Sequence, residues 1–89
     1  LVATSLGRLA CDSEQAERLR QTVQVFLAEK GSYLATAERL HLHKNTVKYR
    51  VDKAMEGRGR PVAEDRFDLE LALMACDRLG PAVLGSPGE

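Results

Sequence analysis

Two helical patterns separated by only three residues constrain this chain more than any other feature. Residues 33–40 predict a short helix that Ser32 can cap, and a second pattern predicts a helix from Lys44 to about Met55. The residues between them are His41, Leu42 and His43. A break this short forces the two helices to pack against each other across a tight turn.

The apolar residues of this segment have the sizes that such a crossing needs. Ala37 is small enough to let the first helix approach the second closely, and Leu40, Leu42 and Val47 are expected to fill the wedge between them. The other side of the second helix carries Lys44, Asn45, Lys48, Tyr49 and Asp52. The second helix therefore has one face that packs and one face that stays polar.

Two longer helices are expected to flank this unit. One begins at Asp12, which with Gln15 resembles a capping box, and ends at Glu29-Lys30-Gly31, where a glycine can adopt the left-handed conformation. The other begins near Asp65, whose side chain can cap it, and runs to about Leu79. Its apolar stripe consists of Leu69, Ala72, Leu73 and Cys76.

The segments between and before these helices complete the expected architecture. Residues 57–61 (GRGRP) are expected to end the middle helix as a flexible basic loop, and residues 1–10 to form a short helix interrupted by Gly7. The predicted fold class is all-α, with four to five helices. We expect an N-terminal helix or linker from an upstream domain at residues 1–11, a helical domain at 12–79 and a disordered tail at 80–89.

Composition limits the protein to one small domain. At 89 residues the core is small, and no apolar run approaches the roughly 18 residues of a membrane span. The first ten residues lack the features of a secretory signal, so no membrane association and a cytoplasmic location are expected. The chain does not begin with Met, which suggests a fragment of a longer polypeptide. Cys11 and Cys76 lack metal or redox spacing and are expected to be reduced and buried.

Charge is distributed unevenly although the net charge is zero. Residues 1–38 hold 4 Lys/Arg against 5 Asp/Glu, residues 39–60 hold 7 against 2, and residues 61–89 hold 2 against 6. The middle segment, which we call the basic block, is therefore +5. A basic segment between acidic flanks is the pattern expected when one element of a protein meets phosphate. The alternative is a solvated charged helix.

The sequence around the turn resembles a known family. Residues 41–50 (HLHKNTVKYR) are similar to the "H-x-N-T-V-x-Y-R" core of PucR-type regulators, and the resemblance extends over about residues 9–79. It implies a C-terminal helix-turn-helix domain of a bacterial transcription regulator that binds double-stranded DNA. It also implies upstream domains that sense an effector metabolite. The loop at residues 57–61 is more basic and glycine-rich than the family pattern.

Roles for the polar residues follow from their places on the second helix, which would enter the major groove by its N-terminal end. The residues expected to contact base edges are His43, Lys44 and Lys48, and those expected to contact phosphate are Thr46, Tyr49 and Arg50, while Asn45 suits either. Alternative roles stay open: an ion pair with the last helix for Arg50, support of the first turn for Thr46 and core packing for Tyr49.

Other function classes find less support. No nucleophile, base and orienting group are arranged as an enzyme needs, His41 and His43 lack a third metal ligand, and no cofactor motif is present, so we expect no catalysis, metal or cofactor. The rival is a helical protein-interaction or dimerisation module. We also expect a homodimer, paired here or through upstream domains, that reads half-sites about 34 Å apart. The apolar residues expected to contribute to the pairing are Leu1, Val2, Leu6 and Leu9, with the alternative that the leucines complete the core of this domain itself.

Overall fold

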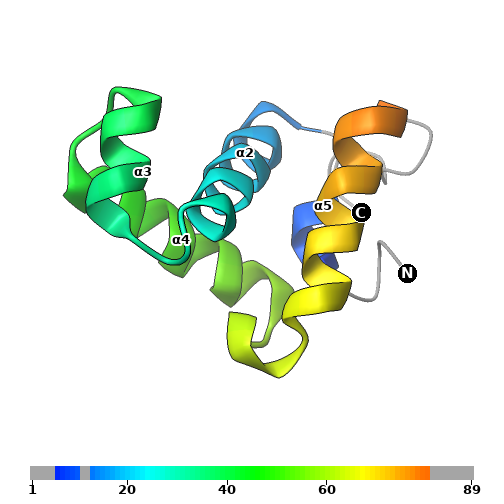
Figure 1. The fold of residues 1–89 in the computed structure, drawn as a ribbon. Helices are drawn as coiled ribbons and strands as arrows, with labels where there is room; N and C mark the ends of the chain where they lie inside the picture. The colour runs from blue at the N-terminus through cyan, green and yellow to red at the C-terminus, as the bar shows by residue number, and fades with distance from the viewer. Residues whose placement is uncertain (1–5, 11–12, 81–89) are drawn as a thin grey trace.

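The computed structural model describes residues 6–10 and 13–80, and these residues are helical, as the sequence predicts (Figure 1). The elements in chain order are the 3₁₀ helix η1 (Gly7–Ala10), the helices α2 (Glu14–Ala28), α3 (Tyr33–Leu40) and α4 (Lys44–Arg58), the 3₁₀ helix η2 (Val62–Glu64) and α5 (Arg66–Leu79). Five of the expected features fall wholly or partly outside the described residues: Leu1, Val2, Cys11, Asp12 and the tail predicted at residues 80–89, of which only Gly80 is described.

The first long helix starts one residue later than the capping-box prediction. Ser13 is the N-cap of α2, and its hydroxyl accepts a hydrogen bond from the Ala16 amide at 3.2 Å. Asp12 lies outside the described residues, and the prediction that it caps the helix was wrong because Ser13 satisfies the free amide instead. The expected end is confirmed, since Gly31 has a φ of 80° and its amide donates to the Phe26 carbonyl at 2.9 Å.

One core cluster joins the two ends of the described chain. Its buried members come from η1, α2, α4 and α5 and include the predicted stripe of α5: Leu6, Leu9, Ala10, Val23, Leu27, Ala54, Leu69, Ala72, Leu73 and Cys76. Leu6 is 0% exposed and Leu9 is 2% exposed. The prediction that these two leucines contribute to a dimer surface was therefore wrong, because they complete the core of their own domain.

The corner between α4 and α5 is fixed by a buried arginine. The Arg58 side chain is fully buried, donates to the carbonyl oxygens of Arg60 and Pro61 at 3.0 Å each, and pairs with the Asp65 carboxylate. This residue lengthens α4 beyond the predicted end at Met55 and replaces the predicted flexible loop with a fixed corner. Its bonds offset the helix-breaking tendency of Gly57.

Two further predictions about the last helix have different outcomes. Asp65 is the N-cap of α5 in position, but it makes no side-chain cap hydrogen bond, because its carboxylate binds Arg58 and lies 3.3 Å from Arg60 Nη1. Cys76 is free and buried, as expected, and burial raises the pKa of its thiol, an effect that the charge of Arg20 partly opposes.

Among the described residues, no helix is long and apolar enough to cross a membrane.

Candidate nucleic-acid interface

The tight turn between α3 and α4 is closed by backbone hydrogen bonds. Ser32 caps α3, as predicted, by accepting from the Ala35 amide at 3.1 Å. At the other end His41 adopts the left-handed conformation with a φ of 57°, and the Leu42 amide donates to the Ala37 carbonyl at 2.9 Å. This arrangement is a helix C-cap that uses histidine where glycine is more usual. It fixes the direction in which α4 leaves α3.

The second core cluster lies directly under this turn. Its buried members are Phe26, Ala37, Val47 and Val51, with Tyr33, Leu42 and Met55 packed against them. Ala37, Leu42 and Val47 thus have the packing roles that the sequence predicts. Leu40 is only half-buried and does not belong to this cluster, so its predicted role in the wedge was wrong. The Phe26 ring enters this cluster from α2 and lies 5.0 Å from the Tyr33 ring, centroid to centroid.

The start of α4 is capped by a histidine side chain. His43 is the N-cap, and its Nδ1 accepts a hydrogen bond from the Asn45 amide at 3.1 Å. A neutral imidazole that accepts through Nδ1 carries its proton on Nε2. The free nitrogen is therefore a donor, and it belongs to an exposed side chain at the beginning of the helix. The sequence predicts His43 as a contact residue but does not predict its structural role as a cap.

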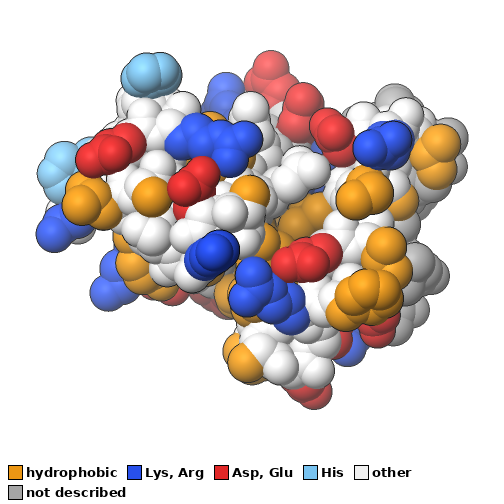
Figure 2. Space-filling model, in the orientation of Figure 1, with side chains coloured by type: hydrophobic (Ala, Val, Ile, Leu, Met, Phe, Trp, Pro, Cys, Tyr) orange, Lys and Arg blue, Asp and Glu red, His pale blue; other side chains and the backbone are white. Residues whose placement is uncertain are grey.

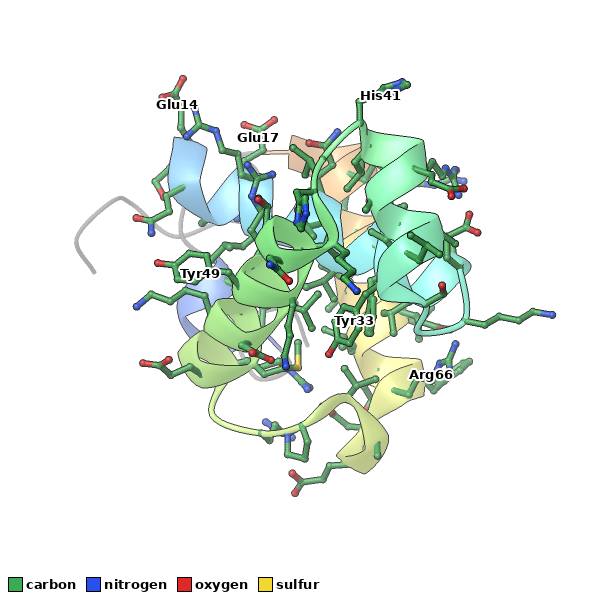
Figure 3. All side chains as sticks on the ribbon, turned by 90° about the vertical axis from the view of Figure 1, so that its left-hand side faces the viewer. Glu14, Glu17, Tyr33, His41, Tyr49 and Arg66 are labelled. Carbon is green, nitrogen blue, oxygen red and sulfur yellow. The ribbon has the colours of Figure 1, made fainter. Side chains whose placement is uncertain are left out.

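The exposed face of α4 is centred on Asn45 and Tyr49. Successive residues of an α-helix are separated by about 100°, and the buried residues Val47, Val51, Ala54 and Arg58 define the opposite side. Tyr49 is 62% exposed and extends from α4 away from α3 (Figure 3), so the alternative that it packs in the core is excluded. Both central side chains are thus free to meet an external surface.

Cations lie on both flanks of this central face. Lys44 and Lys48 follow one flank and are exposed, whereas Arg50 and Lys53 lie on the other side, beyond Tyr49. Within the described residues, none of these four cations makes an ion pair. Arg50 therefore makes no pair with the last helix. Lys53 was not among the predicted contacts, although its exposure and spacing from Asn45 place it with them.

The remaining cations of the basic block are used elsewhere in the fold. Arg39 pairs with Glu29 at 3.0 Å, and Arg58 and Arg60 pair with Asp65. Each of these pairs joins a cation of the block to an acid outside it. Consequently, the positive charge of the block is concentrated on the exposed part of α4 rather than spread over residues 39–60.

Two acids bound this positive region along the helix. Asp52 and Glu56 are exposed and lie one and two turns beyond Lys48, on the same side of α4. A polyanion would meet attraction over the first two turns of α4 and at Lys53, and repulsion from Asp52 and Glu56. The surface suited to an anionic partner, which we call the α4 surface, therefore consists of His43, Lys44, Asn45, Thr46, Lys48, Tyr49, Arg50 and Lys53.

All seven predicted site residues are thus brought together at one end of one helix. Thr46 is half-buried in the first turn, so both of its predicted roles stay open. Within the described ranges, no group of three or more His, Cys, Asp or Glu side chains could hold a metal ion.

The capped turn, the core beneath it and the polar exposed side of α4 define a helix-turn-helix domain. The family model of the PucR C-terminal helix-turn-helix domain matches residues 19–75, and the chain belongs to this family. Its members are regulator domains rather than enzymes. No solved structure matches the chain significantly.

Two characterised relatives align with most of the chain. It is 36% identical over 63 residues to the transcriptional activator PmfR of Paenarthrobacter nicotinovorans and 31% identical over 70 residues to the purine catabolism regulatory protein of Bacillus subtilis. These alignments cover 71% and 79% of this chain. A third relative, the uncharacterized protein YxkF of B. subtilis, is 39% identical over 53% of this chain. The matched region amounts to 13%, 13% and 18% of the three proteins.

Proposed function

We propose that this domain binds double-stranded DNA and places the first two turns of α4 in the major groove. The observation that carries the proposal is the α4 surface, in which Asn45 and Tyr49 are flanked on both sides by cations without an ion partner among the described residues. A groove presents base edges in its floor and phosphates along both walls. The exposed first turns of α4 carry the amide, hydroxyl and cationic side chains that both kinds of contact need.

Individual roles follow from this placement. Lys44, Lys48 and the Nε2 donor of His43 reach base edges, where lysine suits the acceptors of guanine. Asn45, for which the sequence left two roles open, is assigned to the bases because it lies at the centre of the exposed face at the helix start. An asparagine side chain can donate to and accept from adenine at once.

Phosphate contacts come from Thr46 and from the residues that follow Lys48 along the helix. Arg50 and Lys53 approach one wall of the groove, joined by the Thr46 hydroxyl, and the Tyr49 hydroxyl extends away from α3 (Figure 3). These contacts fix the position of the helix without reading sequence. Asp52 and Glu56 repel phosphate from their own side of the later turns of α4.

The names of the relatives suggest the biological setting. One is a transcriptional activator and another regulates purine catabolism. By analogy, the domain serves as the DNA-binding part of a bacterial transcription regulator that acts in the cytoplasm. The effector would bind to parts of the protein outside this chain, and two copies would bind together, since one helix reads few base pairs.

The competing function is a protein-interaction module in which the α4 surface meets an acidic protein. The two functions differ in their response to random duplexes and to salt. Selection of bound sequences from a random duplex pool should return a defined operator, and the binding constant should fall with added salt with a log–log slope of about 0.9 for each phosphate neutralised. If no duplex binds at low salt, the interaction module becomes the better function.

A further inference from the structure

The last helix carries a second apolar face that nothing in the described chain covers. Phe67 is 72% exposed, Met74 is 46% exposed and Leu71 is 39% exposed, although α5 already buries Leu69 and Leu73 on its opposite side. At about 100° per residue the three exposed side chains form one line along the helix. Figure 2 shows hydrophobic side chains along α5 on the molecular surface.

This line continues into Arg78, and we call Phe67, Leu71, Met74 and Arg78 the α5 stripe. We propose that the α5 stripe pairs with the same stripe of a second copy of this chain, with the two α5 helices antiparallel. The spacing of the stripe is four, three and four residues, so it is the same in both directions along the helix. A two-fold axis near residues 72 and 73 therefore sets Leu71 against Met74 and Phe67 against Arg78 of the second copy.

Other registers of the same helix pair fit less well. If Leu71 faced Leu71, Met74 would lie level with Asp68 of the other copy, and if Met74 faced Met74, Leu71 would lie level with Asp77. Both registers bring an apolar side chain against a carboxylate. Only the register centred between residues 72 and 73 gives each apolar residue of the stripe an apolar or cation–π partner.

Charge at the two ends of α5 favours the antiparallel direction. Asp68 and Glu70 lie near the start of the helix and are exposed, and Glu70 pairs there with Arg66 at 3.0 Å, whereas Arg78 lies near its end beside Asp77. Antiparallel pairing brings Arg78 of one copy next to Phe67 and near these two acids of the other. Parallel pairing would bring Arg78 next to Arg78, an unfavourable contact between like charges.

The position of the stripe leaves the DNA-binding face free. In Figure 3 the α4 helix lies toward the viewer and α5 lies farther back, so the two surfaces belong to helices in different parts of the domain. The acids of α5 also make this side unattractive to phosphate. Pairing through the α5 stripe can therefore be tested separately from DNA binding.

Cysteine cross-linking tests both the contact and its direction. In a Cys11→Ser background, Phe67→Cys and Arg78→Cys variants are oxidised mildly, each alone and as an equal mixture. In the proposed register, position 67 of one copy lies level with position 78 of the other. By contrast, position 67 of one copy lies 11 residues, or roughly 16 Å, along the helix from position 67 of the other, and the same holds for position 78. Two identical variants are therefore too far apart to form a disulfide. We expect the disulfide-linked dimer to form at least tenfold faster in the mixture than in either variant alone. Equal rates in all three samples would overturn the proposal.

Sedimentation equilibrium supplies an independent measurement. The doubly substituted variant Leu71→Glu/Met74→Glu should raise the dimer dissociation constant at least tenfold. The matched control Leu79→Glu changes an exposed leucine of the same helix outside the stripe and should leave that constant within about twofold. A chain that stays monomeric at millimolar concentration, or a dimer that the double variant does not weaken, would contradict pairing. Binding of a single half-site should be unchanged in the double variant, which separates this proposal from the proposed DNA contact.

Discussion

Gly7 and the backbone of Arg58 are in direct contact, although 51 positions separate them. A Cβ atom at Gly7 would lie 2.9 Å from the Arg58 Cα and 3.0 Å from the Gly57 carbonyl oxygen, and Gly7 has a φ of 56°. The N-terminal 3₁₀ helix is therefore pressed onto the last turn of α4. The described start of the chain thus supports the helix that carries the α4 surface.

Replacing Gly7 tests this contact. Gly7→Ala should reduce the free energy of unfolding by at least about 2 kcal/mol, because left-handed strain and a backbone collision add together. Gly59→Ala is the matched control, since Gly59 has a φ of 80° but open space around a Cβ, and it should cost only about 1 kcal/mol. Urea unfolding of both variants measures the difference. Equal losses would show that the collision is relieved at little cost.

Breaking the buried ion pair between Arg58 and Asp65 should reduce the free energy of unfolding more than breaking the exposed pair between Arg39 and Glu29. Asp65→Asn leaves the buried Arg58 charge without its carboxylate and should cost about 3–5 kcal/mol. Glu29→Gln breaks the exposed pair with Arg39 and should cost under about 1 kcal/mol. Thermal or urea unfolding of each variant gives the comparison. A small loss for Asp65→Asn would mean that the Arg58 charge is already solvated.

His43 should have two separable roles. His43→Ser keeps a side-chain acceptor at the N-cap, so the free energy of unfolding should stay within about 0.5 kcal/mol, while His43→Ala should lose about 1 kcal/mol. Both variants lack the Nε2 donor and should bind the operator more weakly. Unfolding and DNA titration of the two proteins separate the roles. Unchanged DNA affinity in His43→Ser would restrict His43 to its capping role.

Removing an acidic side chain from α4 should increase the affinity of the domain for DNA. Asp52→Asn removes a negative charge beside the proposed DNA path and should strengthen binding to every duplex several-fold at low salt, with the gain shrinking as salt screens the charge. Glu64→Gln alters an exposed acid of η2, outside the α4 surface, and serves as the control. Fluorescence titration over a salt series measures both. If the control gains as much, net charge rather than the position of Asp52 explains the effect.

Local patterns predicted much of this fold because each depends on neighbouring residues. Apolar spacing identified the packed stripe of α5, and the small Ala37 with the three-residue break identified the helix-turn-helix. Ser32 was recognised as a cap, since only its own turn decides that role. The seven predicted site residues lie together because they belong to one stretch of eight residues, His43 to Arg50, at the start of one helix.

The features that the sequence did not predict depend on distant partners. Arg58 looked like part of a flexible loop, and only the approach of Asp65 and of Gly7 makes it a buried residue that lengthens α4. Leu6 and Leu9 resembled a surface for another copy, because local spacing does not reveal that α2 and α4 pack against the N-terminal 3₁₀ helix. Lys53 was overlooked because it follows the recognised motif.

The central claim is that α4 reads bases with one set of residues and holds phosphates with another. Its most direct test is a competition between the selected operator and a random duplex for wild-type protein, Lys48→Ala and Arg50→Ala. Lys48→Ala should lose sequence discrimination by roughly 1–3 kcal/mol, whereas Arg50→Ala should weaken binding to both duplexes by the same factor. If Arg50→Ala changes the preferred sequence while Lys48→Ala weakens both duplexes alike, the proposed orientation of α4 in the groove is contradicted.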